Sequence, residues 1–276
     1  MSLRALFRLA LLPCATVPLY LGWILTRPIA WVLPKSDPAL QRLWIGTWAK
    51  SILWIMGVKT SFEGPVPDRA AAGGDEPYFL VANHLSYVDI PVLLSRLDAR
   101  FLAKSEIASW PVLGLLARST GTLFVDRSRK RDLTRVIGEV KDVLSRGTGV
   151  IVFPEGTSTD GSQVERYKPS LFEVPVETGV PVRVAALHYE SPDGPKPAWE
   201  AVCWWGDAPF GSHFISFLSQ PRTIATVTFS NEVLDAPSHA QSGARKALAE
   251  AAHRATTSSF TPCRVPDSAS LPVGTP

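Results

Sequence analysis

The fold is decided by residues 149–158, which read Gly-Val-Ile-Val-Phe-Pro-Glu-Gly-Thr-Ser. An apolar run that stops at Pro154 is typical of a buried strand, because proline cannot donate the ladder hydrogen bond that a central strand requires. Residues 133–145, which precede this run, carry apolar side chains at helical spacing, and Gly147 follows them as a C-cap. A helix that leads into a buried strand predicts one unit of an α/β fold.

The same alternation of strand and helix continues on both sides of this unit. Further strands are expected at 78–82, 101–103, 122–125, 182–187 and 225–229, and further helices at 109–119 and 242–258. We therefore predict an α/β domain over residues 59–260, with a central, largely parallel sheet flanked by helices. From Thr261 the chain is rich in Pro, Ser, Gly and Thr, which predicts a disordered tail over residues 261–276.

The N-terminus has the composition of a membrane element. Residues 9–26 carry no charge, and the second apolar stretch, 43–58, is interrupted only by Lys50. Five of the nine tryptophans lie in the first 54 residues, and tryptophan favours the headgroup layer of a bilayer. The charges through residue 36 are all basic: Arg4, Arg8, Arg27 and Lys35. These features predict a two-helix membrane-associating element over residues 1–58.

The prolines of this element bear on its topology. Pro13 and Pro18 argue against a straight spanning helix, because each removes a helix hydrogen bond. Two helices that enter one leaflet, with both ends on the cytoplasmic side, would fit the prolines, tryptophans and basic flanks together. Two alternatives stay open: a cleaved signal peptide, although no small-x-small cleavage site precedes the second apolar stretch, and a pair of buried core helices.

Composition excludes several classes of protein. The chain has 276 residues, of which 46% are hydrophobic and 19% charged, and this rules out wholesale disorder and a coiled coil. A net charge of +3 is too small to argue for a nucleic-acid partner. The three cysteines form no CxxC pair, so neither a disulfide scaffold nor a cysteine zinc site is expected. The sequence also lacks G-x-S-x-G, Walker A, G-x-G-x-x-G and H-E-x-x-H motifs, and no metal site is predicted.

Polar residues follow four of the predicted strands. They are Asn83-His84, Lys104, Asp126-Arg127 and Glu155-Gly156-Thr157. Because ligands of open α/β sheets bind at the carboxyl ends of strands, this convergence predicts an active site.

A histidine and an aspartate five residues apart form the most informative pair. A carboxylate at Asp89 can hold one ring nitrogen of His84, which raises the basicity of the other nitrogen. That nitrogen could then take a proton from an alcohol. His188 and Asp193 have the same spacing, but they lie in a turn sequence, so we interpret His188 as structural or superficial. A histidine base without a protein nucleophile favours direct transfer to an acceptor hydroxyl.

Two cations could bind an anionic group of the acceptor. Arg127 offers a planar fork suited to phosphate, and Lys104 offers a point charge. Gly156 allows the backbone to approach a ligand closely, and Thr157 adds a hydroxyl. Glu155 has an alternative interpretation as an ion-pair partner of a nearby cation, including Arg127.

These residues carry a resemblance to a known family. Asn83-His84-x-Ser86-x-x-Asp89, Gly121-x-x-Phe124-Val125-Asp126-Arg127, Phe153-Pro154-Glu155-Gly156-Thr157-Ser158 and Val180-Pro181-Val182 resemble the four ordered blocks of the glycerolipid acyltransferases. More closely, the chain resembles bacterial 1-acyl-sn-glycerol-3-phosphate acyltransferases of the PlsC type over about residues 78–190.

The resemblance implies acyl transfer from a thioester donor, acyl-CoA or acyl-carrier protein, to a lysolipid hydroxyl, with no further cofactor. It implies His84 as the general base and Asp89 as its orienting partner, at the cytoplasmic face of a bacterial inner membrane. The substrate-binding residues that we predict are Asn83, Ser86, Lys104, Arg127, Glu155, Gly156 and Thr157. Membrane lipid and the acyl donor are the expected partners.

One segment departs from the pattern of the family, and another resembles a stretch found in some of its bacterial members. After Val182, the family usually continues with apolar residues and proline, whereas this chain continues Arg183-Val-Ala-Ala. Residues 203–207, Cys-Trp-Trp-Gly-Asp, resemble a stretch of bacterial members that include lyso-ornithine-lipid acyltransferases, whose acceptor has no phosphate.

Because the blocks at Gly121–Arg127 and Phe153–Ser158 are both intact, and the stretch Trp204–Asp207 is too short to outweigh them, the resemblance implies acylation of the sn-2 hydroxyl of lysophosphatidate, which gives phosphatidate. The same O-acyl transfer to another lysolipid, such as lyso-ornithine lipid, is the near alternative. A non-catalytic membrane lipid-binding protein and a thioesterase are alternatives of other classes. The oligomeric state is left open.

Overall fold

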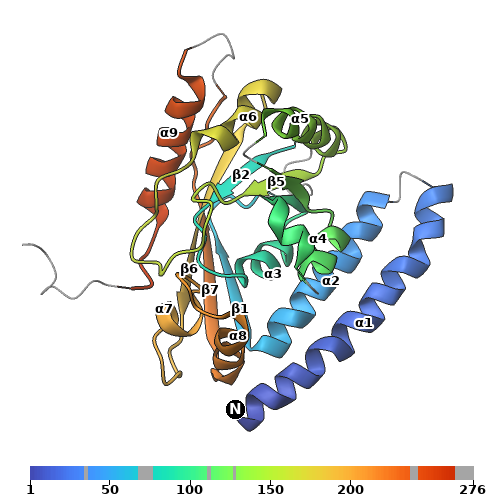
Figure 1. Cartoon of the computed structure of the whole chain (residues 1–276), viewed down its shortest axis with the longest axis vertical. Coiled ribbons are helices and arrows are strands. Elements are labelled where there is room, and N and C mark those ends of the chain that lie inside the picture. Colours follow the sequence, from blue (N-terminus) through green and yellow to red (C-terminus); the bar gives the residue numbers. More distant parts are fainter. Residues whose placement is uncertain (34–36, 68–76, 111–112, 127–128, 237–241, 265–276) are drawn as a thin grey trace, which may run out of the picture.

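The centre of the molecule is a seven-stranded sheet with the strand order β1-β7-β6-β2-β5-β3-β4 (Figure 1). The computed structural model describes residues 1–33, 37–67, 77–110, 113–126, 129–236 and 242–264. The strands are β1 (Val58–Glu63), β2 (Phe79–Ala82), β3 (Ala99–Lys104), β4 (Leu123–Val125), β5 (Gly149–Val152), β6 (Val182–Glu190) and β7 (Thr223–Phe229).

Most neighbouring strands of the sheet are parallel, as the sequence predicts. The strands β6, β2, β5, β3 and β4 run in one direction, whereas β7 is antiparallel to β6 and β1 is parallel to β7. The two strands at this edge therefore run opposite to the rest. The sequence predicts β7 but not its direction, and it does not predict β1, which is polar and mostly exposed.

Helices cover both faces of the sheet. They are α1 (Leu3–Val32), α2 (Asp37–Met56), α3 (Asp89–Leu94), α4 (Leu113–Ser119), α5 (Lys130–Ser145), α6 (Glu173–Thr178), α7 (Ala198–Ala201), α8 (Phe210–Ser219) and α9 (Ala244–Ser259). Short 3-10 turns lie at Ser105–Ser109 and Pro169–Phe172. Along β2, Leu80 and Ala82 join the core shared with α2, α3 and α8, whereas Phe79 and Val81 join the core shared with α5, α6 and α9. A strand that is apolar on both faces is therefore buried on both faces.

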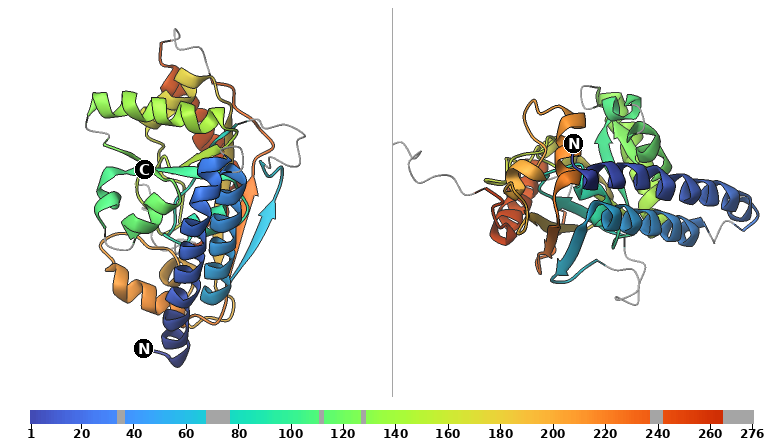
Figure 2. Two further views of the ribbon diagram at one scale, coloured as in Figure 1. Left: turned by 90° about the vertical axis from the view of Figure 1, so that its right-hand side faces the viewer. Right: turned by 90° about the horizontal axis from the view of Figure 1, so that it is seen from below.

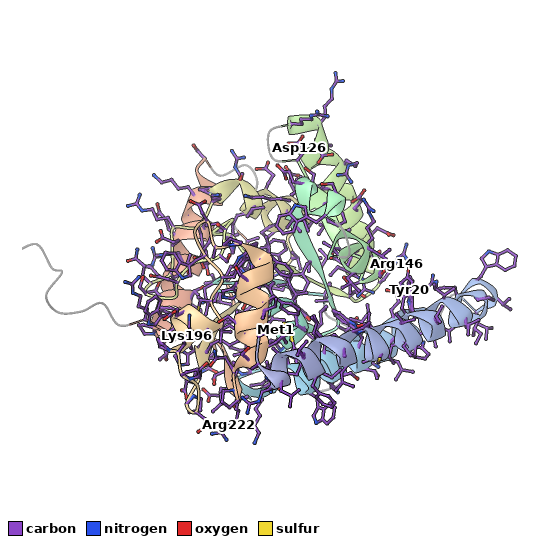
Figure 3. All side chains as sticks on the ribbon, turned by 60° about the horizontal axis from the view of Figure 1, so that its bottom comes forward. Met1, Tyr20, Asp126, Arg146, Lys196 and Arg222 are labelled. Carbon is purple, nitrogen blue, oxygen red and sulfur yellow. The ribbon has the colours of Figure 1, made fainter. Side chains whose placement is uncertain are left out.

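The first two helices form an antiparallel hairpin beside the sheet domain (Figures 2 and 3). The α1 helix continues through Pro13, Pro18 and Pro28, so the prolines do not interrupt it. Each proline removes one backbone hydrogen bond of the helix. A helix in a membrane tolerates this loss where a neighbouring helix or nearby side chains satisfy the freed carbonyl group. Residues Leu3–Ile29 are long and apolar enough to cross a membrane, by length and composition only, with a mean hydropathy of 1.7.

The two helices of the hairpin differ in their surroundings. On α1, most apolar side chains are exposed, and Trp31 is 85% exposed. On α2, by contrast, one face is buried in the core of the sheet domain through Ile45, Ala49, Ile52, Leu53 and Met56. The α2 helix thus forms one wall of that core, which fits the alternative of a core helix for the second apolar stretch.

A buried arginine attaches α1 to the domain. The guanidinium of Arg8, which is 9% exposed, donates to the carbonyl oxygens of Leu218 (3.0 Å), Gln220 (2.6 Å) and Pro221 (3.2 Å). These carbonyls lie at the end of α8, where the helix leaves acceptors without intrahelical partners. Arg8 therefore serves as a C-terminal cap supplied by another helix.

The predicted disorder after Thr261 does not hold for the residues that the structure describes. The backbone N–H of Cys263 donates to Gly161 O at 2.8 Å, and Arg264 forms an ion pair with Asp160 at 2.7 Å. Arg264 also stacks over the ring of Trp199. Residues 265–276 lie outside the described residues.

Candidate active site

Four parallel strands, β2, β5, β3 and β4, bring their carboxyl ends to one edge of the sheet. His84 follows β2, Glu155 follows β5 and Lys104 ends β3. The structure therefore places these predicted residues at a common edge, where Lys104 is exposed. Arg127 follows β4 but lies outside the described residues, so its anion-binding role stays a prediction.

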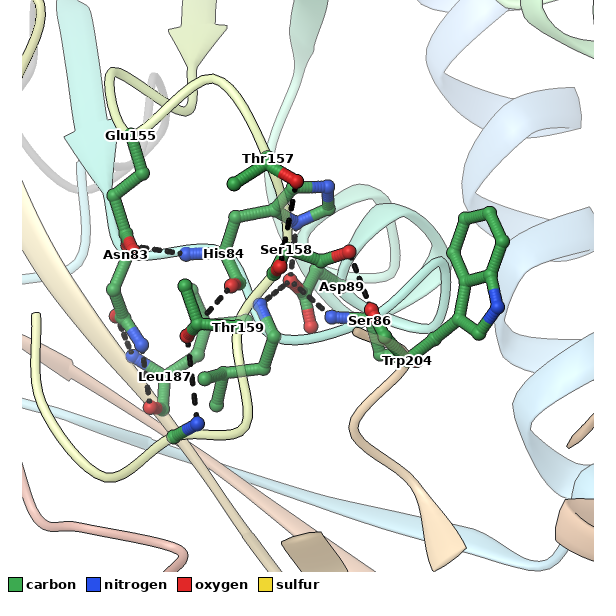
Figure 4. Close-up of polar contacts among 12 residues, drawn as sticks. Asn83, His84, Ser86, Asp89, Glu155, Thr157, Ser158, Thr159, Leu187 and Trp204 are labelled. Atoms are coloured by element: carbon green, nitrogen blue, oxygen red, sulfur yellow. Dashed lines mark hydrogen bonds and ion pairs between the residues drawn. The ribbon is translucent and has the colours of Figure 1, made fainter. Parts of the chain in front are cut away.

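His84 and Asp89 form a direct pair (Figure 4). The distance between His84 Nδ1 and Asp89 Oδ2 is 2.7 Å. A short loop returns the chain from β2 to α3, and Asp89 is the first residue of that helix. With Nδ1 donating to the carboxylate, Nε2 keeps the lone pair that can accept a proton. The His84 side chain is 22% exposed, whereas that of Asp89 is fully buried.

Backbone amides reinforce the Asp89 carboxylate. Its Oδ2 atom accepts hydrogen bonds from the N–H groups of Leu85 at 2.8 Å and Ser86 at 3.1 Å. Donors of this kind stabilise the ionised carboxylate, which in turn stabilises an imidazolium at His84. The same amides fix the loop, so residues 84–89 act as one rigid turn.

An aromatic ring fixes the plane of the imidazole. The ring of His84 stacks on Phe153 with a centroid distance of 4.2 Å and an interplanar angle of 5°. Phe153 itself stacks on Phe101 of β3. The imidazole therefore has little freedom to rotate away from Asp89.

A tyrosine that the sequence analysis did not single out contacts Asp89 from another strand. The hydroxyl of Tyr189, on β6, donates to Asp89 Oδ1 at 2.6 Å. Burial and the neighbouring carboxylate raise the pKa of Tyr189 well above its ordinary value, so the hydroxyl keeps its proton. No local motif marks this residue, because the contact joins positions 100 residues apart.

Asn83 and Glu155 brace the backbone around His84. The side chain of Asn83 both donates to Leu187 O (3.1 Å) and accepts from Leu187 N (2.7 Å), which ties the end of β2 to β6. Glu155 Oε1 accepts from the N–H of His84 at 2.8 Å, and Oε2 accepts from Glu165 N at 3.3 Å. These contacts engage the polar atoms of both side chains, and substrate contact by either residue stays a prediction.

Burial is the main cause of an unusual ionisation at Glu155. The side chain is 3% exposed, and its removal from water raises the pKa of Glu155 to about 8. The two backbone donors oppose this shift without cancelling it. At neutral pH much of the Glu155 population is therefore protonated.

The loop after β5 passes beside His84. Gly156 adopts a φ of +75°, which an L-side chain rarely adopts, and Thr157 beyond it is exposed. The N–H of Thr159 donates to His84 O at 2.9 Å, and the Ser158 hydroxyl donates to Trp204 O (Figure 4). Ser86, by contrast, is buried, and its hydroxyl has no hydrogen-bond partner among the described residues.

An aromatic cluster lies next to this turn, and the sequence analysis did not predict it. The ring of Tyr87 contacts Trp204, Phe210, His213, Phe214 and Phe217. The Tyr87 hydroxyl and His213 Nδ1 are 3.0 Å apart. The segment that contains Cys203 and Trp204 is thus packed against the turn that carries His84.

His188 and Asp193 have the same spacing in the sequence as His84 and Asp89, but their side chains bind different partners. His188 Nδ1 lies 2.9 Å from Thr261 O, and His188 Nε2 lies 3.4 Å from Glu190. Asp193 forms its ion pair with Arg222 instead, at 2.9 Å. His188 therefore holds the C-terminal segment, in agreement with its structural interpretation.

Known proteins resemble this chain both in sequence and in fold. The family model named Acyltransferase matches residues 59–187. The chain is 34% identical over 211 residues to a lyso-ornithine lipid O-acyltransferase of Rhodobacter capsulatus, covering 74% of this chain and 71% of that protein. It is 32% identical over 228 residues to a lyso-ornithine lipid O-acyltransferase of Rhizobium meliloti, covering 79% and 72%.

Two further proteins that resemble this chain are named as acyltransferases of a 1-acyl-glycerophosphate. It is 35% identical over 119 residues to a 1-acyl-sn-glycerol-3-phosphate acyltransferase of Neisseria gonorrhoeae, covering 43% of this chain and 47% of that protein. In fold, it resembles the crystal structure of the 1-acyl-sn-glycerophosphate acyltransferase PlsC from Thermotoga maritima. The TM-score is 0.56 at 20% identity, covering 89% of this chain and 96% of that one.

Proposed function

This chain belongs to the glycerolipid acyltransferase family, and from that premise we propose that it moves a fatty acyl group from a thioester donor to a hydroxyl of a lysolipid. The observation that carries the mechanism is the pairing of His84 with a buried carboxylate at 2.7 Å, which leaves Nε2 as the basic nitrogen. Acyl-CoA or acyl-carrier protein would supply the thioester.

The proposed step uses His84 as both base and acid. The acceptor hydroxyl gives its proton to Nε2 as its oxygen bonds to the thioester carbonyl carbon. The tetrahedral intermediate then collapses, the carbon–sulfur bond breaks, and the thiolate takes the proton from the imidazolium. Asp89 stabilises the imidazolium in between, and no acyl-enzyme is formed.

We favour lyso-ornithine lipid as the acceptor. The relatives with that activity match 74% and 79% of this chain, whereas the gonococcal lysophosphatidate relative matches 43%. This reverses the preference for lysophosphatidate that the sequence blocks favoured. Lysophosphatidate stays the second candidate, because the block that ends in Arg127 suits a phosphate.

The reaction would take place at the surface of a membrane. The exposed apolar side chains of α1 fit insertion into lipid, and both acyl donors are soluble in the cytoplasm. We therefore propose that the His84 edge of the sheet faces the cytoplasmic leaflet.

The test is a comparison of acceptors. Purified protein in vesicles receives a labelled acyl donor and, separately, lyso-ornithine lipid, lysophosphatidate or water alone, and mass spectrometry identifies the product. We expect a larger kcat/KM with lyso-ornithine lipid. A larger value with lysophosphatidate would reverse the acceptor assignment, and release of free fatty acid without transfer would make the protein a thioesterase. Binding of lysolipid without any product would leave only a lipid-binding role.

A further inference from the structure

We propose that Tyr189 is a positioning residue of this transfer, and that His84, Asp89 and Tyr189 work as one hydrogen-bonded unit. The inference rests on the proposed function. Its basis is the 2.6 Å hydrogen bond from the Tyr189 hydroxyl to Asp89 Oδ1, between side chains that are 1% and 0% exposed.

The two oxygens of the Asp89 carboxylate have different partners. Oδ2 accepts from His84 Nδ1, Leu85 N and Ser86 N, whereas Oδ1 accepts from the Tyr189 hydroxyl. All four donors come from described residues. A buried carboxylate oxygen that loses its donor keeps the full cost of desolvation, because no water replaces the lost bond. Tyr189 therefore satisfies the oxygen that faces away from His84.

The position of Tyr189 is fixed by its strand. β6 pairs with β2 up to Ala185 opposite Ala82, and the Asn83 side chain then bonds both backbone groups of Leu187. Beyond this clamp, the N–H of Tyr189 donates to Cys263 Sγ at 3.2 Å. The phenol ring lies in the same core as Leu187 and Phe217. The pairing of β6 with β2 and the contact with Cys263 thus place the Tyr189 hydroxyl next to Asp89.

Two consequences follow for the reaction. The hydroxyl holds the carboxylate in the rotation that points Oδ2 at Nδ1, and it supports the negative charge that stabilises the imidazolium. Without it, the carboxylate can rotate or take up a proton, and either change weakens its hold on His84. The loss falls on kcat rather than on KM, because the imidazolium forms only during the reaction.

The direct test is Tyr189→Phe with Tyr167→Phe as the matched control. Tyr167 is also buried, and its hydroxyl donates at 2.7 Å to Thr256 in the other core, away from Asp89. We expect Tyr189→Phe to lower kcat roughly tenfold, by analogy with the loss seen when the hydrogen-bond partner that orients a metal ligand is removed. We also expect a shifted acid limb in its pH profile, whereas Tyr167→Phe keeps the kcat and the pH profile of the parent.

A double-mutant cycle separates positioning from simple packing. If Tyr189 acts through the charge of Asp89, Tyr189→Phe should lower kcat far less in an Asp89→Asn background than in the parent. Equal losses in both backgrounds would overturn the proposal, and so would a Tyr189→Phe enzyme with the kcat and pH profile of the parent.

A spectroscopic measurement distinguishes failure of this inference from failure of the proposed function. The proton on His84 Nδ1 is followed by NMR in the parent, Tyr189→Phe and Tyr167→Phe proteins, which needs no turnover. We expect its resonance to move in Tyr189→Phe alone. If the parent protein has no transfer activity, the proposed function is wrong. If the resonance of the His84 Nδ1 proton does not move in Tyr189→Phe, the positioning role of Tyr189 is wrong. If Tyr189→Phe fails to fold, difluorotyrosine is placed at position 189 instead, which keeps the ring and makes the hydroxyl a stronger donor to Asp89 Oδ1. We expect the resonance of the His84 Nδ1 proton to move in that protein as well, and an unmoved resonance would overturn the role of Tyr189.

Discussion

His84 carries the proposed chemistry through a single ring nitrogen, so its removal should abolish most of the transfer. We expect His84→Ala to lower kcat by ~10²–10⁴-fold, the usual contribution of a general base. The matched control is His188→Ala, since His188 has the same spacing to an aspartate but no contact with it. Steady-state kinetics on both purified variants makes the comparison. If the kcat of His84→Ala is close to that of the parent, the proposed mechanism is wrong.

Glu155 predicts a dependence of stability on pH. The pKa of Glu155 is raised to about 8 in the folded protein, above its value in the unfolded chain. Between the unfolded and the folded pKa of Glu155, the folded protein therefore binds more protons than the unfolded chain. The stability that the protonated Glu155 contributes is lost as the pH rises from about 5 to 8. The free energy of unfolding falls by at most ~1.4 kcal/mol per pH unit in this range. The Glu155→Gln variant has no carboxyl group at this position, so it lacks this contribution to the pH dependence of stability.

Denaturant unfolding at pH 5 and pH 8 measures this effect. We expect the parent to lose more stability than Glu155→Gln as the pH rises. An identical pH dependence in the two proteins would show that the Glu155 carboxyl does not titrate in this range.

The sequence predicted the residues of this edge that follow strands directly, because strand ends and short spacings are local features. It placed His84 and Glu155 at one edge of the sheet, and it paired Asp89 with His84. It did not identify Tyr189 or the clamp between Asn83 and Leu187, since both depend on the pairing of β2 with β6 across about a hundred residues. Pairing between strands that are so far apart in the chain produces no periodic pattern in the sequence.

Among the elements, the attachment of α1 to α8 depends on Arg8. Arg8→Gln would leave three carbonyl oxygens at the end of α8 without their donor. We expect the free energy of unfolding to fall by roughly 1.5–3 kcal/mol, the range for hydrogen bonds to a charged group. The control is Arg4→Gln, because Arg4 is exposed and, among the described residues, donates only to the carbonyl oxygen of Ser219, at 3.1 Å. Denaturant titration in detergent compares the two, and equal effects would contradict the capping role.

Element prediction succeeded where apolar periodicity was strong. The strand predicted at 149–153 and the helix predicted at 133–145 correspond to β5 and α5. β1 was missed because only its first residue is buried, and the reversed direction of β7 depends on a partner strand rather than on its own sequence. The expectation that prolines interrupt α1 holds for an isolated helix, whereas α1 packs along α2 and continues through all three prolines.

At the scale of the whole molecule, we expect the two N-terminal helices to have different roles, with α1 binding the membrane and α2 stabilising the fold. Deletion of residues 1–33 removes α1 and its exposed apolar side chains but keeps the buried face of α2. We expect this variant to fold, as judged by circular dichroism, and to lose its binding to vesicles of anionic phospholipid in a sedimentation assay. Deletion of residues 1–58 removes the core residues of α2 as well, and we expect that variant to unfold.

Two outcomes would contradict this division of roles. A protein without residues 1–33 that sediments with vesicles like the parent would place the membrane contact in the sheet domain. A protein without residues 1–58 that keeps a cooperative unfolding transition would make α2 dispensable for the core.

The reversed edge of the sheet has a consequence for biosynthesis. β1 follows α2 directly, yet its pairing partner β7 begins only at Thr223, opposite Val58. At ~5–20 residues per second, the ribosome needs on the order of 10–30 seconds to make the roughly 160 residues between them. During that interval α1 and α2 are complete while β1 has no partner strand. A polar, charged strand is better suited to this state than an apolar one, because it offers little for another chain to bind.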